Sequence, residues 1–290
     1  MEGVFLLSYV SMKEMINDAK DKGYAIGAFN IVDYITAVSV IKAAEIKNSP
    51  VIIQTSTKTV SLYGYSAIVG WVKTLAAESK VPVALHLDHC KDLNIIKNCI
   101  DAGWSSVMID ASSYSLDENI HMTQQVVEMT RGKDITVEGE LGAIVGVEDD
   151  IFVSEHDEHL ADPQTCIKYV NATGIDILAP AIGTAHGIYH KDPNISFKLI
   201  EEIATSTGMP LAIHGGTGLS EDVFKKCILS GGAKINISTS IKHTFRDSLE
   251  GYYKAHPGDY EPVKAIGFLK ENVMKLVADF IDIFGSANKA

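Results

Sequence analysis

The sequence predicts a single (β/α)₈ barrel over residues 1–290, with an extra helix before the first strand and further helices after the last one. Short runs rich in Val and Ile alternate with segments whose apolar residues recur at helical spacing. Several of these runs are apolar throughout, as expected of parallel strands covered on both faces. No linker, low-complexity tract or block of charge divides the chain, so we expect one domain.

Eight runs are predicted to be strands, and they cover residues 25–29, 51–54, 83–87, 106–109, 135–138, 175–178, 211–213 and 234–237. Helices are predicted at residues 12–20, 37–47, 93–102, 119–130, 163–172, 195–205, 221–230, 241–255 and 263–284. Asp162 before Pro163, and Ser220 before Glu221, are typical of helix N-termini. A doubly wound open sheet is the alternative fold. It calls for a glycine-rich fingerprint after the first strand, which residues 27–30 (GAFN) do not provide.

Composition and charge exclude several functional classes. Apolar residues make up 46% of the chain, too many for a disordered protein. No run of about 18 apolar residues could span a membrane, and the apolar patch at 4–10 is too short for a signal peptide. The 4 cysteines lack C-x-x-C spacing, so we expect a reduced, cytoplasmic protein. The net charge of −12 disfavours nucleic acid as a partner, but leaves room for a local site that binds a small phosphorylated molecule.

Polar residues at the strand ends are the candidate site residues, because active sites of this fold lie where the strands end. His89 follows the third predicted strand, His186 the sixth and His214 the seventh. Three imidazoles that converge from three strands are the ligand set of a catalytic zinc with one open position. One such histidine alone would be assigned to ordinary packing, but their joint placement favours metal binding. For His86, barrel-facing and packing roles both stay open.

Carboxylates accompany these histidines. Asp88 is placed either to transfer a proton to a metal-bound substrate or to orient an imidazole. Glu138 and Glu140 alternate with Gly139 and therefore point to one side of the fifth strand, where one of them could be a further ligand. A long loop with an acidic stretch is expected over 143–161, and loops of this length are more often functional than filler.

Two late segments predict an anion site. Residues 214–218 (HGGTG) place backbone N–H groups where a phosphate can approach them. Residues 236–239 (NIST) lead into a helix whose N-terminus also favours an anion. Phosphate binding by the loops after strands seven and eight recurs in such barrels. The residues alone therefore indicate a metal-dependent barrel enzyme that acts on a phosphorylated small molecule and uses a carboxylate for proton transfer.

Taken in order, these motifs resemble the class II, zinc-dependent ketose-bisphosphate aldolases, which include fructose- and tagatose-1,6-bisphosphate aldolases. The motifs are residues 88–89 (DH), 138–142 (EGELG), 183–187 (GTAHG), 214–218 (HGGTG) and 234–239 (KINIST), and the resemblance extends over essentially the whole chain. It implies a lyase of carbohydrate metabolism, as in glycolysis. Such an enzyme reversibly cleaves a ketose phosphate to dihydroxyacetone phosphate and an aldehyde through a metal-stabilised enediolate.

The resemblance also implies roles for single residues. His89, His186 and His214 would bind the catalytic zinc, while Glu140, with Asp110 as a further candidate, would bind an alternative or second metal position. Asp88 would protonate the aldehyde-derived oxygen during condensation and take the proton back in cleavage. Glu148 would move the proton on the carbon of dihydroxyacetone phosphate.

Substrate binding is implied for a further set of residues. The phosphate and enediolate would be bound by Gly187, Gly215, Gly216, Thr217, Asn236, Ile237, Ser238 and Thr239. Ser56 would touch the far end of the substrate, and Lys242 would serve as a distal cation. A monovalent cation (Na⁺ or K⁺) near the phosphate and a homodimer or homotetramer are further implications of the resemblance.

Two departures bear on the choice of substrate. Ser238 stands where fructose-specific relatives commonly carry Asp or Asn, and tagatose enzymes a small residue. Relatives that bind a second phosphate usually supply an Arg near the C-terminus, where this chain reads EPVK over 261–264. Lys242 and Lys264 then remain as distal cations, and Lys holds phosphate less firmly than Arg. The alternative is an aldolase for a ketose 1-phosphate whose aldehyde half is unphosphorylated or otherwise substituted.

Alternatives from other classes are a non-catalytic barrel that supports a partner enzyme and a metal-dependent hydrolase that activates water. The first would be expected to have lost a ligand or Asp88, and the second to carry a His-x-His pair on the first strand; neither is the case here. Lys58, Lys73 and Lys91 could lie near the barrel mouth. None of the three closes an apolar strand, which weighs against a Schiff-base mechanism.

Overall fold

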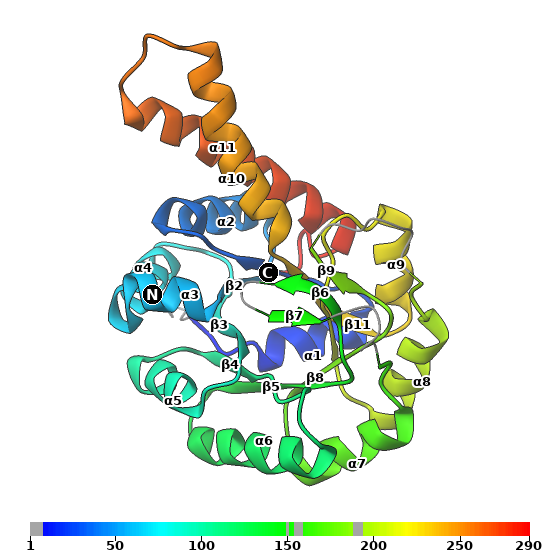
Figure 1. Ribbon diagram of the computed structural model, residues 1–290. Coiled ribbons are helices and arrows are strands. Elements are labelled where there is room, and N and C mark those ends of the chain that lie inside the picture. Colours follow the sequence, from blue (N-terminus) through cyan, green and yellow to red (C-terminus); the bar gives the residue numbers. More distant parts are fainter. Residues whose placement is uncertain (1–7, 149–150, 154–158, 188–193) are drawn as a thin grey trace, which may run out of the picture.

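A closed barrel of parallel strands forms the centre of the computed structural model, which describes residues 8–148, 151–153, 159–187 and 194–290. The strands follow the order β1-β11-β10-β8-β5-β4-β3-β2 around the barrel, and helices surround them (Figure 1). They are β1 (Ile26–Asn30), β2 (Val51–Thr55), β3 (Val83–Cys90), β4 (Ser106–Ile109), β5 (Thr136–Leu141), β8 (Ile177–Pro180), β10 (Leu211–Ile213) and β11 (Gly232–Ile237). The predicted (β/α)₈ barrel is confirmed, and every predicted strand overlaps one of its strands.

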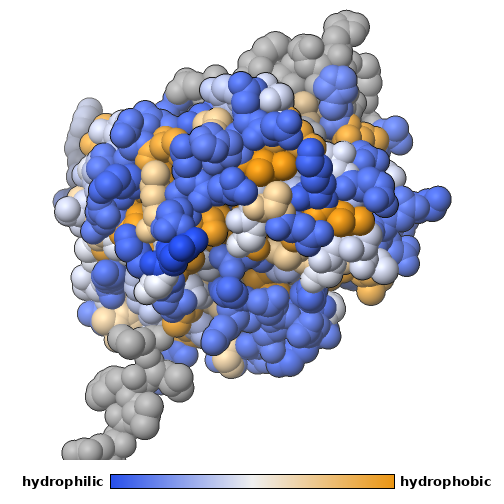
Figure 2. Space-filling view, turned by 90° about the horizontal axis from the view of Figure 1, so that it is seen from below, coloured by the Kyte–Doolittle hydropathy of each residue, from blue (hydrophilic) through white to orange (hydrophobic). Residues whose placement is uncertain are grey.

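The outer helices lie where the apolar periodicity predicts them, with one addition. They are α2 (Tyr34–Lys47), α3 (Thr57–Tyr63), α4 (Tyr65–Ala77), α5 (Leu93–Ala102), α6 (Leu116–Thr130), α7 (Pro163–Thr173), α8 (Phe197–Thr207) and α9 (Glu221–Leu229). Asp162 caps α7 and Ser220 caps α9, as predicted. The addition is α3 with α4, where Gly64, Gly70 and several β-branched residues weaken the helical pattern of the sequence. On the face shown in Figure 2, hydrophilic side chains predominate and apolar ones form small, separated areas.

The barrel interior is apolar toward the N-terminal ends of the strands and polar toward their C-terminal ends. α1 (Lys13–Lys22), the predicted extra helix, lies against the apolar end. The buried side chains that pack together there are Met12, Met15, Ile16, Ala19, Tyr24, Ile26, Ala28, Ile52, Ala84, Ile177, Ala179, Ala212 and Ala233. The buried polar side chains beyond them include Gln54, His86, Ser106, Glu138 and Lys234. This separation places the polar chemistry at one mouth of the barrel.

The expectation of an irregular loop over 143–161 is wrong in part. β6 (Val145–Glu148) and β7 (Ile151–Val153) form an antiparallel pair, and β6 also pairs in parallel with β9 (Ala185–His186). The sequence places apolar residues on both sides of an acidic stretch, and strand pairing satisfies the backbone groups of the paired residues. The resulting three-stranded sheet lies outside the barrel and joins the segment after β5 to the segment after β8.

α10 (Thr239–Ala255) and α11 (Pro262–Phe284) form a helical hairpin, part of which projects from the barrel as an arm (Figure 1). The far half of α11 is anchored, because Phe280 and Phe284 pack with Phe224 in the outer core. The projecting part exposes 91% of Tyr260 and 69% of Val263. Among the described residues, no helix combines the length and apolar character needed to cross a membrane.

Candidate active site

Two imidazoles meet at the barrel mouth from opposite sides. His89 lies on β3 and His214 directly follows β10, and these two strands are diametrically opposed in the eight-strand order. His214 Nδ1 lies 2.8 Å from His89 Nε2. His89 also has a φ of 44°, an uncommon conformation for a residue with a side chain, and such outliers concentrate at functional sites.

A carboxylate lies behind each imidazole. The Nε2 atom of His214 is 2.8 Å from Glu138 Oε1, and the Nδ1 atom of His89 is 3.5 Å from Asp110 Oδ2. A carboxylate accepts a hydrogen bond from the ring nitrogen that carries the proton. The other nitrogen of that ring then keeps its lone pair. For His214, the nitrogen left with its lone pair is Nδ1, which faces His89 Nε2. A carboxylate behind an imidazole is a common arrangement around metal-binding histidines.

Asp88 is buried beside these rings with both carboxylate oxygens occupied. Asn30 Nδ2 donates to Oδ2 at 2.9 Å, and Asn236 Nδ2 donates to Oδ1 at 3.2 Å. Burial raises the pKa of Asp88, but the electrostatic interactions with His89, Lys234 and His214 outweigh it and hold the pKa below its usual value. The carboxylate is therefore ionised at neutral pH and is available to accept a proton.

Asp110 and Glu140 form a second carboxylate group on the other side of His89. Burial raises the pKa of Glu140 well above its usual value, and the neighbouring Asp110 charge raises it further. Ser112 Oγ donates to Asp110 Oδ1 at 2.7 Å and helps to keep Asp110 ionised. A divalent cation would relieve the repulsion between the two carboxylates, because both would become ligands.

The donor atoms fit a divalent metal in two overlapping groups. One group is Asp88, His89 and His214, and the other is His89, Asp110 and Glu140; within each, the ligand atoms lie within 4.8 Å of one another. Imidazole nitrogens combined with carboxylate oxygens are the ligands that catalytic zinc prefers. The predicted pairing of His89 with His214, and the nearness of Glu140 and Asp110, agree with this geometry.

His186 and Glu148 are described only through their backbones. β9 carries His186, whose backbone pairs with Gly146 of β6, and Glu148 ends β6; the side chains of both lie outside the described part of the chain. Gly215 lies against β9, because a Cβ atom on Gly215 would stand 2.5 Å from the Ala185 carbonyl oxygen. The segment that carries His186 is therefore packed against the loop that follows His214.

The segments predicted to bind phosphate lie together. Thr217 Oγ1, in the loop after β10, accepts a hydrogen bond of 3.4 Å from Ser240 N in the first turn of α10. Ser238, the residue before α10, provides no side-chain cap. Its buried hydroxyl has no hydrogen-bond partner among the described residues. The N-terminus of α10 is thus open to an anion between Thr217 and Thr239.

Three further residues are predicted to bind the substrate, and each of them lies in a different environment. The Ile237 side chain packs in the outer core, so that only its backbone can face the mouth. Ser56 caps α3 by accepting from Thr59 N at 3.4 Å, at the C-terminal end of β2. Lys242 is exposed on α10. Lys264, the other cation considered, forms an ion pair of 2.9 Å with Asp259 within the helical hairpin.

Lys234 is a buried lysine whose position in the site was not predicted from the sequence. It is fully buried on β11, with Nζ 2.9 Å from Glu138 Oε2. The alternation of the strand could have revealed it, because Lys234 shares the inward parity of Asn236 and Ser238. A salt-bridged ammonium has no lone pair with which to attack a carbonyl, so this lysine does not favour a Schiff-base mechanism.

His86 faces the barrel interior rather than the helices. Its Nδ1 atom is 2.7 Å from Ser106 Oγ, and its Nε2 atom is 3.5 Å from Glu138 Oε2. Burial lowers the pKa of His86 well below its usual value, and the charge of Lys234 lowers it further. His86 is therefore neutral and belongs to the buried polar layer that also contains Ser106 and Glu138.

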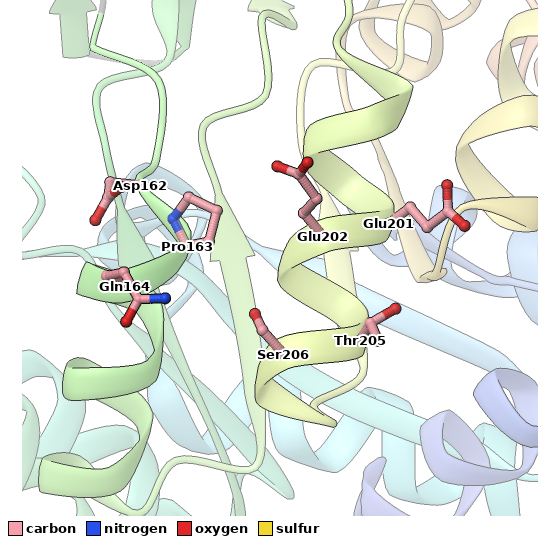
Figure 3. A pocket seen from close by; sticks show the side chains of 7 residues that line it. All are labelled: Asp162, Pro163, Gln164, Glu201, Glu202, Thr205 and Ser206. Carbon is pink, nitrogen blue, oxygen red and sulfur yellow. The ribbon is translucent and has the colours of Figure 1, made fainter.

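A separate acidic groove lies in the outer ring between α7 and α8, where Asp162 and Glu202 stand on opposite walls (Figure 3). The Asp162 carboxylate accepts from Thr165 N at 2.8 Å and caps α7. Glu202 Oε1 is 3.3 Å from Lys198 Nζ, one helical turn away on α8. The two carboxylates therefore stabilise α7 and α8. The candidate catalytic residues lie instead at the barrel mouth.

Comparisons with known proteins cover nearly the whole chain. The model of the family "Fructose-bisphosphate aldolase class-II" matches residues 10–289. A probable fructose-bisphosphate aldolase of Bacillus subtilis is 42% identical over 97% of this chain and 99% of its own. A fructose-bisphosphate aldolase of Staphylococcus aureus is 40% identical with the same coverage. The crystal structure of the YdjI aldolase from Escherichia coli superposes with a TM-score of 0.87 at 31% identity, over 97% of this chain and 99% of that one.

Proposed function

The chain belongs to the class II fructose-bisphosphate aldolase family, and from this premise we propose a zinc-dependent cleavage of fructose- or tagatose-1,6-bisphosphate to dihydroxyacetone phosphate and an aldehyde. The family consists of aldehyde-lyases of carbohydrate metabolism. Membership implies a sugar-phosphate substrate and a divalent metal. The identity of the metal, the sugar and the roles of single residues are parts of the proposal.

The convergence of His214 Nδ1 and His89 Nε2 at 2.8 Å carries the proposal. His89, His214 and His186 would hold the metal, with Glu140 and Asp110 at an alternative or second position. When bound, the metal supplies a Lewis acid that stabilises negative charge on the substrate oxygens during cleavage of the carbon–carbon bond. This complete set also favours catalysis over a supporting role for the barrel.

Asp88 is proposed to handle the proton on the aldehyde side of the bond. In cleavage, its ionised carboxylate accepts the proton of the hydroxyl that becomes the aldehyde oxygen. In condensation, it returns that proton to the same oxygen. The hydrogen bonds from Asn30 and Asn236 fix the carboxylate in one orientation, which supports this role. Glu148, at the end of β6, is proposed to move the proton on the carbon of dihydroxyacetone phosphate.

The phosphate of the dihydroxyacetone half is proposed to bind at the N-terminus of α10. The hydrogen bond between Thr217 and Ser240, the uncapped start of α10 and the unpartnered Ser238 hydroxyl support this position. The remaining predicted groups around the phosphate and enediolate are Gly187, Gly215, Gly216, Asn236, the backbone of Ile237, and Thr239. A monovalent cation, Na⁺ or K⁺, beside the phosphate belongs to the same proposal.

The ion pair of Lys264 favours a second candidate substrate. Lys264 stands in the stretch where a phosphate-binding cation is expected, but Asp259 occupies its ammonium at 2.9 Å. Lys242, on α10, is the other cation proposed for the distal end of the substrate. A ketose 1-phosphate with an unphosphorylated or otherwise substituted aldehyde half is the substrate class that this arrangement would also fit.

Release of dihydroxyacetone phosphate from a panel of ketose phosphates tests the proposal. The panel contains fructose and tagatose 1,6-bisphosphates and several ketose 1-phosphates, each with zinc and with chelator. Fast, chelator-sensitive cleavage of a bisphosphate is the expected result. Cleavage of monophosphates alone would replace the bisphosphate by the second candidate. Activity that survives complete metal removal would overturn the mechanism.

The projecting arm is proposed to join subunits into a homodimer or homotetramer. Tyr260 and Val263 are more than half exposed there, and Phe268 is exposed as well. Exposed apolar side chains on a projecting helix are typical of protein interfaces.

A further inference from the structure

A buried ion pair lies directly beneath the metal-binding histidines. Lys234 on β11 and Glu138 on β5 are both fully buried, and their Nζ and Oε2 atoms are 2.9 Å apart. The other carboxylate oxygen of Glu138, Oε1, is 2.8 Å from His214 Nε2. One carboxylate therefore connects an internal cation to an imidazole at the mouth.

The hydrogen bonds around Glu138 determine which nitrogen of His214 carries a proton. A carboxylate that is salt-bridged to lysine can only accept, so His214 Nε2 must donate. His214 Nδ1 then carries the lone pair, and it points toward His89 Nε2. If the His214 proton moved to Nδ1, it would stand between the two rings where a metal must bind.

The neighbouring histidine does not compete for this role. Ser106 Oγ donates to the Thr136 carbonyl at 3.2 Å, so the hydroxyl can only accept from His86 Nδ1, which lies 2.7 Å away. His86 Nε2 is then without a proton and is 3.5 Å from Glu138 Oε2, too far for a hydrogen bond of ordinary geometry. Glu138 is thus committed to Lys234 through one oxygen and to His214 through the other.

We propose that Glu138 is a positioning residue, and that Lys234 anchors it so that His214 presents Nδ1 to the metal. Glu138 acts through His214 and does not itself touch the metal or the substrate. Lys234 holds the Oε2 atom and so prevents the carboxylate from turning away from the ring. The inference rests on the proposed metal site and assigns the ion pair a function beyond barrel stability.

A purely structural role is the competing explanation, and one double variant separates the two. Replacement of Glu138 alone would leave the Lys234 ammonium buried without a partner, which can prevent folding. Glu138→Met combined with Lys234→Met removes both charges and the oxygen that accepts from His214 Nε2, and it keeps the lengths of the two side chains nearly constant. If the pair only supports the barrel, this neutral pair should restore stability and zinc binding together.

Zinc affinity of the double variant is the first measurement, by competition with a fluorescent chelator. We expect a 10–100-fold loss of affinity, the usual effect of removing a carboxylate behind a metal-binding histidine. The urea midpoint of the metal-free variant should stay near that of the parent. Ser106→Ala is the matched control, because Ser106 is equally buried but its hydroxyl bonds to His86 and to the Thr136 carbonyl rather than to Glu138 or His214; its zinc affinity should stay within about twofold of the parent. A folded double variant with parental affinity would overturn the proposal.

Nitrogen NMR of the metal-free parent protein, labelled with ¹⁵N-histidine, is the second measurement. We expect His214 to show one tautomer, with the proton on Nε2. A proton on Nδ1 would overturn the proposal even if the double variant does not fold. Because this experiment requires no metal, it also separates the inference from the proposed function. A parent protein that shows the expected tautomer but binds no zinc would disprove only the proposed function.

Discussion

His214 Nδ1 and His89 Nε2 lie 2.8 Å apart although their strands, β10 and β3, are on opposite sides of the barrel. Both rings are buried, and a carboxylate lies behind each of them. Closure of the barrel therefore brings together two nitrogens that are separated by 125 residues in the chain. Without a metal or a proton between them, two lone pairs at this distance would repel each other.

Removal of the metal should abolish activity and lower stability together. A metal that is present at 1,000 times its dissociation constant stabilises the folded state by about 4 kcal/mol. We therefore expect the thermal midpoint to fall on chelation and to recover with zinc. Zinc affinity should also weaken as the pH falls, because His89 and His214 bind it only without a proton on the facing nitrogens. Thermal unfolding with and without chelator at several pH values checks this, and equal midpoints would contradict it.

Asp88→Asn should separate metal binding from catalysis. The amide cannot accept a full proton, so kcat should fall by about 10²–10⁴-fold, the usual contribution of a general acid or base. Zinc content should stay near the parental level, because His89, His186 and His214 are the proposed ligands and Asp88 is proposed to transfer a proton rather than to hold the metal. Kinetics and metal analysis of the purified variant provide the measurement.

The control for this variant is Asp101→Asn on α5, where Asp101 pairs with Lys97 on the surface. We expect parental kinetics from it. If Asp88→Asn kept parental kcat, the proton-transfer role of Asp88 would have to be abandoned.

Gly139→Ala should destabilise the barrel at the strand that carries both carboxylates. A Cβ atom at Gly139 would overlap the Tyr169 hydroxyl, which hydrogen-bonds Thr123. We expect a loss of about 1–3 kcal/mol, as for overpacked cores. Adding Tyr169→Phe removes the overlapping oxygen and should recover part of the loss. Urea unfolding of the single and double variants measures both effects, and an unchanged midpoint for Gly139→Ala would contradict the prediction.

Thr217→Val should weaken binding of the phosphate half of the substrate. The variant keeps the side-chain volume but removes the oxygen that accepts from Ser240 N. It also removes the hydrogen bond that the Thr217 hydroxyl is proposed to donate to the phosphate, which is worth about 1 kcal/mol, so KM should rise about five- to tenfold with a smaller change in kcat. Steady-state kinetics provide the measurement. Thr207→Val on α8 is the control, because its hydroxyl bonds to the Ile203 carbonyl and the Met209 N–H and to none of the proposed phosphate-binding groups.

Val263→Asp combined with Phe268→Asp should dissociate the proposed homo-oligomer. Both residues are exposed on the arm, so the charges should disturb the subunit interface without disturbing the fold. Light scattering after gel filtration should show a smaller species than the parent. Identical masses for the two proteins would mean that the arm does not hold subunits together.

The sequence predicted the barrel because eight apolar runs alternate with segments whose apolar residues recur at helical spacing. In β3, β5 and β11 every second residue faces the interior, so the placement of Asp88, Glu138, Glu140 and Asn236 could be read from alternation alone. The meeting of His89 with His214 depends on barrel closure and also on the φ of 44° at His89, because parity would place His89 and its neighbour Asp88 on opposite faces of β3.

Other features depend on pairings that parity does not reveal. β6 pairs with β9 across many intervening residues, and no local pattern specifies that partner. The α3–α4 region has weak helical periodicity because β-branched residues and glycine interrupt it. Lys234 was overlooked because a lysine is expected at the surface, and its burial depends on Glu138 of a distant strand.

The division of the barrel interior into an apolar and a polar half has a consequence for evolution. α1 and the apolar layer form a foundation that contains none of the groups proposed to act on the substrate. Sequence drift in that layer is constrained by shape and volume, whereas drift at the mouth is constrained by chemistry. Descendants of this chain can therefore acquire activity on new sugars through substitutions at the mouth, while α1 and the apolar layer stay unchanged.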